Sequence, residues 1–267
     1  MNELMRELAP ITAAAWGEIE EEAKRTLTTY LAARKLVDFS GPHGWEHSAV
    51  SLGRSENVGV GREGVEARLR QVQPLTELRV PFTLKRAELD AIARGAEDAD
   101  LDPVVEAAKK IALAEDAAVF HGAEAAGIEG IAQAADARKV ALSDDYLQYA
   151  ISVAEATHQL RAAGIGGPYA LALGPRCHEG VHKTFTSAGF PVLEQVRRLV
   201  DGPIVWAPAI DGAVVLSLRG GDFELTVGQD LSIGYLRHDA ETVTLYLQES
   251  FTFRCLDPEA AVPLRYG

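Results

Sequence analysis

Cysteine is scarce in this sequence. Cys177 and Cys255 are the two among 267 residues, too far apart for a zinc-binding or redox-active pair. We therefore exclude a disulfide scaffold and expect two reduced thiols. The chain also lacks an apolar run near the roughly 20 residues that cross a bilayer. Glu3 and Glu7 stand where a secretory signal would need basic residues and an apolar stretch. These absences predict a cytoplasmic protein without a membrane partner.

Positive charge is also in short supply. The chain has 39 acidic and 26 basic residues, a net charge of −13. Such a chain repels phosphate backbones unless its cationic side chains gather on one surface. Arg68 with Arg70 and Arg197 with Arg198 are the nearest candidates, and both pairs stand among apolar residues. The sequence therefore predicts no nucleic-acid partner.

Hydrophobic periodicity predicts a mixed α and β chain whose last third is mostly strand. The longest helix is expected over residues 11–34, where Trp16, Ile19, Leu27 and Leu31 recur at helical spacing. Further helices are predicted at 85–94, from Asp102 as N-cap with Pro103 after it, and at 143–163, 175–185 and 191–200. Strands are predicted at 36–39, 78–84, 169–173, 204–206, 214–218 and most of 222–255.

Residues 51–73 form a glycine-rich, charged stretch with strand-like ends. This pattern predicts a hairpin that reaches away from the body of the protein. A lone two-stranded hairpin is marginally stable in water. We therefore expect another subunit to hold this arm.

Two short motifs suggest chemistry that their surroundings disfavour. Gly59, Gly61 and Gly64 spell GxGxxG, but the prolines at 74 and 81 leave no room for the βαβ unit of a dinucleotide site. His43, Glu46 and His47 spell the inverted zinc-peptidase motif HxxEH, which requires a helix. The neighbouring glycines and proline predict a turn there, with two surface histidines.

A third motif, HExxH, has a better context. His178, Glu179 and His182 follow Pro175, which can begin a helix, so two imidazoles could bind zinc while the carboxylate activates water. Gly180 weakens the helix, Lys183 places a cation beside the metal, and no third ligand is evident. A zinc peptidase is therefore the alternative hypothesis, and a solvated helix face is the simpler interpretation.

Several longer blocks in one order resemble a known family. They are RGGDFELTVGQDLSIGY at 219–235, ESFTFR at 249–254, RKLVDF and GPHGWE within 34–46, LRQVQPLTELRVPFTL at 69–84, ELDAIARG at 88–95, and GIGGPYALALGP at 164–175. Together they closely resemble the family 1, linocin-like encapsulins, the shell proteins of bacterial nanocompartments. The match spans nearly the whole chain, so it is far more specific than any five-residue motif.

The resemblance implies an α+β fold of the tailed-phage major capsid (Hong-Kong-97) type. Mapped onto this sequence, residues 1–49 carry the N-terminal helix and begin a peripheral domain. Residues 50–75 form an extended arm, 76–134 continue the peripheral domain, 135–218 form an axial domain, and 219–267 return to the peripheral domain. The fold implies self-assembly into an icosahedral shell, most simply of 60 copies.

Encapsulin shells enclose an enzyme, often a dye-decolorising peroxidase or a ferritin-like protein, by binding its C-terminal targeting peptide. By similarity, the cargo-binding residues are Leu27, Tyr30, Leu31, Arg34, Asp38, Leu231, Ile233 and Tyr235. The fivefold pore loop is Thr184, Phe185, Thr186, Ser187, Ala188, Gly189 and Phe190. Apolar side chains would hold Leu or Ile anchors, while Arg34 and Asp38 could pair with charges of the peptide.

The resemblance predicts no catalytic residue, metal or cofactor in the shell subunit. Some family members carry flavin against an aromatic side chain at the position of Ala87, so this chain does not support a flavin. A viral capsid is a further alternative, because the same fold encloses genomes. The negative net charge argues against packaged nucleic acid.

Overall fold

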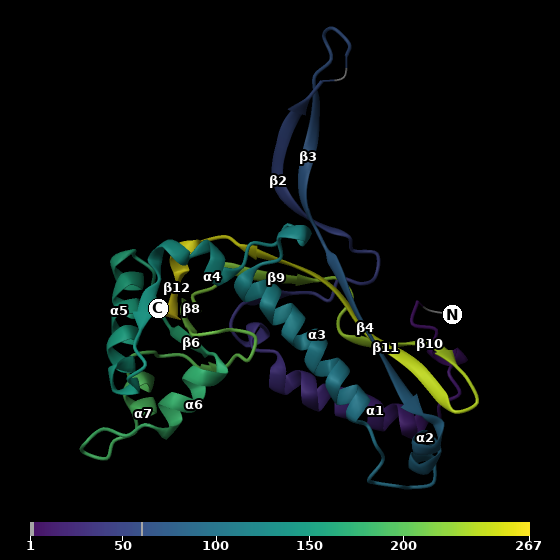
Figure 1. The fold of residues 1–267 in the computed structure, drawn as a ribbon. Coiled ribbons are helices and arrows are strands. Elements are labelled where there is room, and N and C mark those ends of the chain that lie inside the picture. The colour runs from purple at the N-terminus through teal and green to yellow at the C-terminus, as the bar shows by residue number, and fades with distance from the viewer. Residues whose placement is uncertain (1–2, 60) are drawn as a thin grey trace.

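A computed structural model describes residues 3–59 and 61–267 of the chain. Two sheets with their helices form the body, and a two-stranded arm projects from it (Figure 1). Val60, within the predicted arm, lies outside the described residues, as do residues 1–2. No helix in the two described ranges is both long and apolar enough to span a bilayer.

The first sheet has the strand order β1-β9-β11-β10, and β4 also pairs with β11. Its strands are β1 (Asp38–Ser40), β4 (Thr76–Lys85), β9 (Phe223–Val227), β10 (Ser232–His238) and β11 (Thr242–Cys255). Three helices pack against it: α1 (Ala13–Tyr30), α2 (Arg86–Ala93) and α3 (Asp102–His121). Their apolar faces enclose a core with Ile19, Ile111 and Leu245, each fully buried.

The second sheet has the order β5-β12-β8-β6-β7. Its strands are β5 (Val140–Leu142), β6 (Tyr169–Leu173), β7 (Ile204–Trp206), β8 (Ala213–Ser217) and β12 (Ala261–Tyr266). The nearby helices are α4 (Ile131–Ala134), α5 (Tyr149–Ala162), α6 (Pro175–Lys183) and α7 (Val192–Arg197). Every residue of β6 and β8 is buried. Their sequences are accordingly apolar along almost the whole strand, as expected for strands covered on both faces.

The last strand joins the second sheet and not the first. β12 lies between β5 and β8, although the predicted return of residues 219–267 to the peripheral domain includes this strand. Neither β5 nor β12 was predicted, and Pro263 within β12 is a residue that argues against a strand. Pro263 pairs with Val214 of β8, and the ladder to β5 begins only at Leu264. The domain boundaries stay predictions.

Most other expected elements form, with shifted ends. The predicted helix 143–163 begins as a 3₁₀ turn at Tyr146–Gln148, and α5 starts at Tyr149. The N-cap of α3 is Leu101, so Asp102 lies one position further into the helix than predicted. α7 covers a smaller part of the predicted 191–200. Gly95 and Gly164 follow α2 and α5 with positive φ, the left-handed conformation in which a glycine commonly ends a helix.

The predicted hairpin is present as β2 (Ala49–Val58) and β3 (Ala67–Pro74). It forms its own two-stranded sheet and stands clear of the body (Figure 1). Leu69 and Val72 on β3 are 56% and 52% exposed, a high value for apolar side chains. Exposed apolar side chains on an unsupported hairpin indicate a surface that another molecule covers.

We expect Leu69→Asp to prevent association between copies of the chain. The subunit fold should survive, because this side chain contributes little to either core. Light scattering would follow particle size, and circular dichroism would follow the fold.

Glu56→Gln is the matched control, because Glu56 lies opposite Leu69 in the hairpin register. It should assemble like the wild type. Normal assembly of Leu69→Asp would show that the arm makes no essential contact through this side chain.

Candidate functional site

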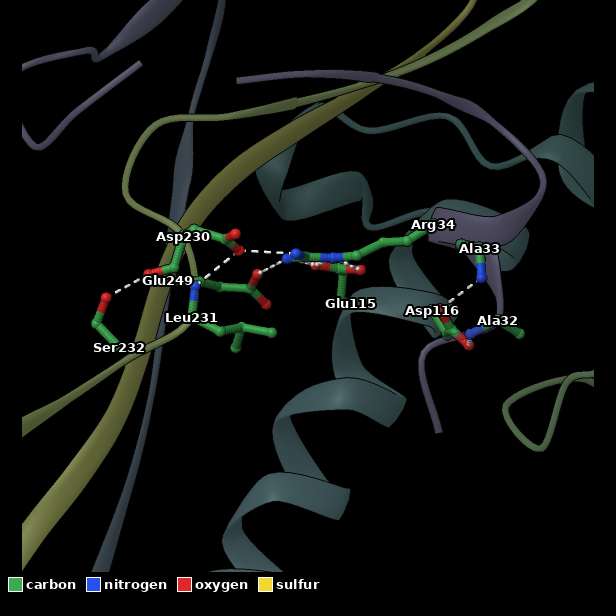
Figure 2. Close-up of polar contacts among 9 residues, drawn as sticks. All are labelled: Ala32, Ala33, Arg34, Glu115, Asp116, Asp230, Leu231, Ser232 and Glu249. Atoms are coloured by element: carbon green, nitrogen blue, oxygen red, sulfur yellow. Dashed lines mark hydrogen bonds and ion pairs between the residues drawn. The ribbon is translucent and has the colours of Figure 1, made fainter. Parts of the chain in front are cut away.

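The predicted helix 11–34 ends at Tyr30 because a buried carboxylate accepts hydrogen bonds from two backbone N–H groups that follow the helix. Asp116 on α3 accepts hydrogen bonds from the N–H groups of Ala32 (2.8 Å to Oδ2) and Ala33 (3.0 Å to Oδ1). These bonds hold a 3₁₀ turn at Ala33–Lys35. Arg34 therefore leaves the helical path and points toward α3 and the first sheet (Figure 2).

The guanidinium of Arg34 binds three carboxylates from three parts of the chain. Its Nε contacts both oxygens of Glu115 at 2.9 Å, and its Nη1 contacts Asp230 Oδ1 at 2.7 Å. Its Nη2 contacts Glu115 Oε2 at 2.5 Å and Glu249 Oε2 at 2.9 Å. Figure 2 shows the four side chains converging from α3, β11, the turn before β10 and the 3₁₀ turn after α1. We call these residues the Arg34 charge centre.

Burial of the Arg34 charge centre changes the pKa values of its members. The side chains of Glu115 and Glu249 are fully buried, and that of Arg34 is 16% exposed. Burial alone would lower the pKa of Arg34, but the hydrogen bond and charge of Glu115 outweigh it and raise the pKa. Burial, then the negative charge of Glu115, raises the pKa of Glu249 well above 4.5. Oε1 of Glu249 has no hydrogen-bond partner among the described residues.

Three carboxylates beside one guanidinium leave an excess of negative charge that a buried site tolerates poorly. The raised pKa of Glu249 follows from this excess, because protonation of one carboxylate relieves the repulsion within the centre. Asp116 adds to this pattern: burial raises its pKa to about 7, against the lowering effect of the two backbone hydrogen bonds.

A groove of about 530 Å³ opens beside the charge centre, between α1 and β10. The lining residues are Leu4, Arg6, Glu20, Ala23, Lys24, Leu27, Thr28, Leu31, Arg34, Asp230, Leu231, Ser232, Ile233 and Leu247. We call it the α1–β10 groove. Apolar side chains from both walls line it together with the charged side chains of Arg6, Glu20, Lys24, Arg34 and Asp230.

The two ends of the groove are defined by contacts. At one end, Arg34 binds Asp230 just before β10. At the other, the carbonyl of Leu4 accepts the N–H of Tyr235 (2.8 Å), and Arg6 pairs with Glu20 (2.6 Å). The C-terminal end of α1 therefore lies by the start of β10, and the two walls run in opposite directions.

The charge centre also positions an apolar wall of the groove. Oδ1 of Asp230 accepts the backbone N–H of Leu231 at 2.8 Å in addition to the Arg34 contact. The hydroxyl of Ser232 donates to the carbonyl of Asp230 at 2.6 Å. Figure 2 shows Leu231 directly below this tight turn. The turn therefore fixes the direction in which Leu231 enters the groove.

The structure brings five of the eight predicted cargo-binding residues into this groove: Leu27, Leu31, Arg34, Leu231 and Ile233. The other three lie elsewhere. Tyr30 packs on Trp206 with ring centroids 5.4 Å apart, and Asp38 accepts the N–H of Gly221 at 2.6 Å. The hydroxyl of Tyr235 contacts His238 at 2.6 Å. Arg34 lines the groove, but its guanidinium is already bound to the three carboxylates of the charge centre.

Sequence reasoning missed the partners that complete the site. Glu115 and Asp116 are adjacent acids within the apolar stretch ALAEDAAVF, and such a pair could have signalled buried partners. Leu4 and Arg6 belong to a short segment before α1 that carries no periodic pattern. Leu247 is an ordinary strand residue, which only the sheet register places beneath the groove.

The predicted pore loop 184–190 connects α6 and α7 and protrudes from the second-sheet lobe (Figure 1). It closes through the N–H of Thr186, which donates to the carbonyl of Phe190 at 2.8 Å. Phe185 and Phe190 are 56% and 62% exposed. No residue of this loop is charged. The loop therefore presents hydroxyl groups and two aromatic rings to its surroundings.

The HExxH residues lie on α6, a helix that the sequence predicted. The rings of His178 and His182 are 4.1 Å apart, and Nδ1–H of His182 donates to the carbonyl of His178. Glu179 pairs with Lys183 on the exposed face. Across the described ranges, no group of three or more His, Cys, Asp or Glu residues is placed to hold a metal. The donor set therefore does not match a peptidase centre, which needs a third ligand.

The other two motifs have no catalytic context. Gly59, Gly61 and Gly64 lie at the tip of the arm, and β3 rather than a helix follows them. His43 and His47 lie in a turn, as predicted, with ring centroids 4.8 Å apart. Ala87 lines an open hollow between α2 and the β10–β11 turn, and none of the residues lining this hollow is aromatic.

Comparison with known proteins decides the family. Residues 1–252 match the family model described as "Encapsulating protein for peroxidase". The chain is 59% identical to the type 1 encapsulin shell protein of Rhodospirillum rubrum, over 99% of this chain and 97% of that protein. The chain belongs to the type 1 encapsulin shell protein family.

Solved structures confirm the capsid-type fold. A virus-like particle from Pyrococcus furiosus has a TM-score of 0.64 at 18% identity, covering 94% of this chain and 99% of that one. Mycobacterium phage Bobi gives 0.56 at 13% identity, covering 89% and 90%. The predicted tailed-phage major capsid fold is therefore correct, and the encapsulin interpretation outweighs the peptidase and viral alternatives.

We expect Glu249→Gln to flatten the pH dependence of stability of this encapsulin. Because the pKa of Glu249 is raised in the folded state, its contribution is full below about 4.5 and is lost as pH rises through the folded pKa. The amide reproduces the protonated acid and has no such loss. Between pH 5 and pH 8, its melting temperature should fall by at least about 2 °C less than that of the wild type.

Scanning calorimetry across this pH range would measure the difference. Glu77→Gln is the control, because Glu77 is an exposed partner of Arg79 and should keep the slope of the wild type. An equal slope in Glu249→Gln would contradict the raised pKa of Glu249.

Proposed function

We propose that the chain assembles into an icosahedral shell of 60 copies and captures a cargo enzyme by its C-terminal peptide in the α1–β10 groove. The observation that carries the docking proposal is the groove itself. It combines a floor of Leu31, Ile233 and Leu247 with the less buried walls Leu27 and Leu231. An apolar surface of this kind, with a polar rim, is typical of a peptide-binding site.

The geometry limits the length of the bound peptide. From Glu20 to its end at Tyr30, α1 spans about 15 Å at roughly 1.5 Å per residue. An extended peptide advances about 3.3 Å per residue, so about five residues fit. Alternate side chains of an extended segment point to one side, so two or three apolar anchors would enter the groove. This is the footprint that a short tail with Leu or Ile at alternate positions would fill.

The charge centre has a different role in this proposal from the one expected from the sequence. Arg34 and Asp230 close one end of the groove as an ion pair instead of offering a free guanidinium to the peptide. Specificity then comes from the shape of the apolar floor. Because Tyr30, Asp38 and Tyr235 lie outside the groove, the proposal assigns docking to the other five predicted residues.

The class of cargo is proposed from the family description, which names a peroxidase as the encapsulated protein. A ferritin-like cargo is the other class that the resemblance implies.

In the assembled shell, loop 184–190 would line the fivefold pore. Its uncharged residues would then admit small neutral molecules more readily than a charged ring would.

We expect the purified chain to elute as a particle of megadalton size, because 60 copies of a 28.7 kDa chain are required for the shell. Size exclusion with light scattering would measure the mass. The absorbance ratio at 260 and 280 nm should be that of protein alone. A stable monomer would exclude the shell, and a ratio typical of nucleic acid would favour a genome-packaging particle.

We expect Leu231→Asp to weaken capture of a cargo peptide by at least about tenfold. A buried leucine contributes roughly 1.5–3 kcal/mol, and the carboxylate adds a desolvation cost. Fluorescence anisotropy with a labelled Leu- and Ile-bearing peptide would measure the affinity.

Leu236→Asp is the matched control, because this leucine on the same strand is 51% exposed and lies outside the groove. It should bind the peptide as the wild type does. Equal binding by Leu231→Asp and the wild type would show that the peptide docks elsewhere.

A further inference from the structure

The residues before α1 form a structured segment along the groove. Met5 has a left-handed backbone conformation (φ 50°), which non-glycine residues rarely adopt, and a 3₁₀ turn follows at Arg6–Leu8. We call Glu3–Ala9 the strap. Its carbonyl groups accept two hydrogen bonds from the first sheet: Tyr235 N–H to Leu4 (2.8 Å) and the hydroxyl of Tyr246 to Glu3 (3.4 Å).

A side chain of the strap completes its attachment to α1. The guanidinium of Arg6 pairs with Glu20 at 2.6 Å and lies 4.1 Å from the ring centroid of Trp16. Leu4 and Arg6 both line the α1–β10 groove. The strap is therefore the wall at the end opposite the Arg34 charge centre, and it lies across Trp16.

The strap is held weakly in comparison with that charge centre. None of its residues from Glu3 to Ala9 is buried, and the Arg6–Glu20 pair has side chains 31% and 50% exposed. Exposed pairs contribute little to stability, and a non-glycine residue in the left-handed region adds strain. Such a segment opens at low cost.

The strap also occupies an edge that a peptide could use. β10 is an edge strand of the first sheet, and the N–H of Tyr235 is taken by Leu4 in place of another strand. Extended peptides commonly add to an exposed sheet edge through such groups. Opening of the strap would free this donor and uncover the ring of Trp16.

We propose that the strap determines the length of peptide that the groove accepts, by closing the end at Leu4 and Arg6. This inference rests on the proposed docking function and adds a specificity element to it. A peptide that fills the groove from Asp230 to Glu20 binds with the strap closed. An apolar residue beyond that footprint gains no contact until the strap opens.

Arg6→Ala tests the proposal, because it removes the ion pair and the cover on Trp16 while leaving Leu4 in place. The probes are a labelled five-residue peptide with Leu and Ile anchors and two versions extended by one leucine, at either end. We expect the wild-type shell to bind all three within about twofold. Arg6→Ala should bind one extended version roughly five- to tenfold tighter than the five-residue peptide.

Arg25→Ala is the matched control, because Arg25 pairs with Glu22 on α1 and does not line the groove. It should show the pattern of the wild type. Equal ratios among the three peptides in Arg6→Ala and the wild type would overturn the proposal.

Acrylamide quenching of tryptophan fluorescence provides a readout without peptide. We expect it to increase in Arg6→Ala and not in Arg25→Ala, and unchanged quenching would show that Arg6 does not hold the strap. If the wild-type shell binds none of the peptides, the proposed docking function fails instead, and the quenching result still decides whether Arg6 covers Trp16.

Discussion

The groove depends on one largely buried cation, the guanidinium of Arg34. Arg34 sits where α1 ends, α3 passes and β10 begins, and its guanidinium holds a carboxylate from the neighbouring segments. A buried charge without partners is very costly. If one of these segments moved away, it would leave a charged side chain of the centre without its partner. The centre therefore fixes the spacing of the groove walls. A hydrophobic contact in its place would not impose that geometry.

The same centre explains why the helix ends where it does. The apolar stripe of α1 continues through Leu31, yet Asp116 satisfies the amides of Ala32 and Ala33 and halts the helix. Without that break, Arg34 would continue along the helix surface. The carboxylate on α3 therefore makes an internal anchor of Arg34. Leu27 on α1 and Leu31, the residue directly after the helix, both line the groove.

Much of the architecture was predictable from local patterns, and the failures have physical causes. Helices with strong apolar periodicity and glycine termini, such as α2, formed as expected, as did the arm between residues 51 and 73. β12 was missed because Pro263 argues against a strand, and its pairing depends on residues far away in the sequence. Tyr30 and Asp38 were assigned to the groove by the resemblance to encapsulins. Instead, Tyr30 packs on Trp206 and Asp38 accepts the N–H of Gly221. Both partners are far away in the sequence, so local patterns could not place them nearby.

The sequence by itself determined the capsid-type fold, the family and the apolar residues at Leu27, Leu31, Leu231 and Ile233. These follow from periodicity and from long blocks that resemble other shell proteins, both of which are local properties of the chain. Only the tertiary structure decided that Arg34 is an internal anchor and that Leu4 and Arg6 of the strap line one end of the groove. Those facts depend on contacts between Glu115, Glu249 and Arg34, and between Leu4 and Tyr235. The residues in each set are far apart in sequence, so only the folded chain decides which charges and backbone groups meet.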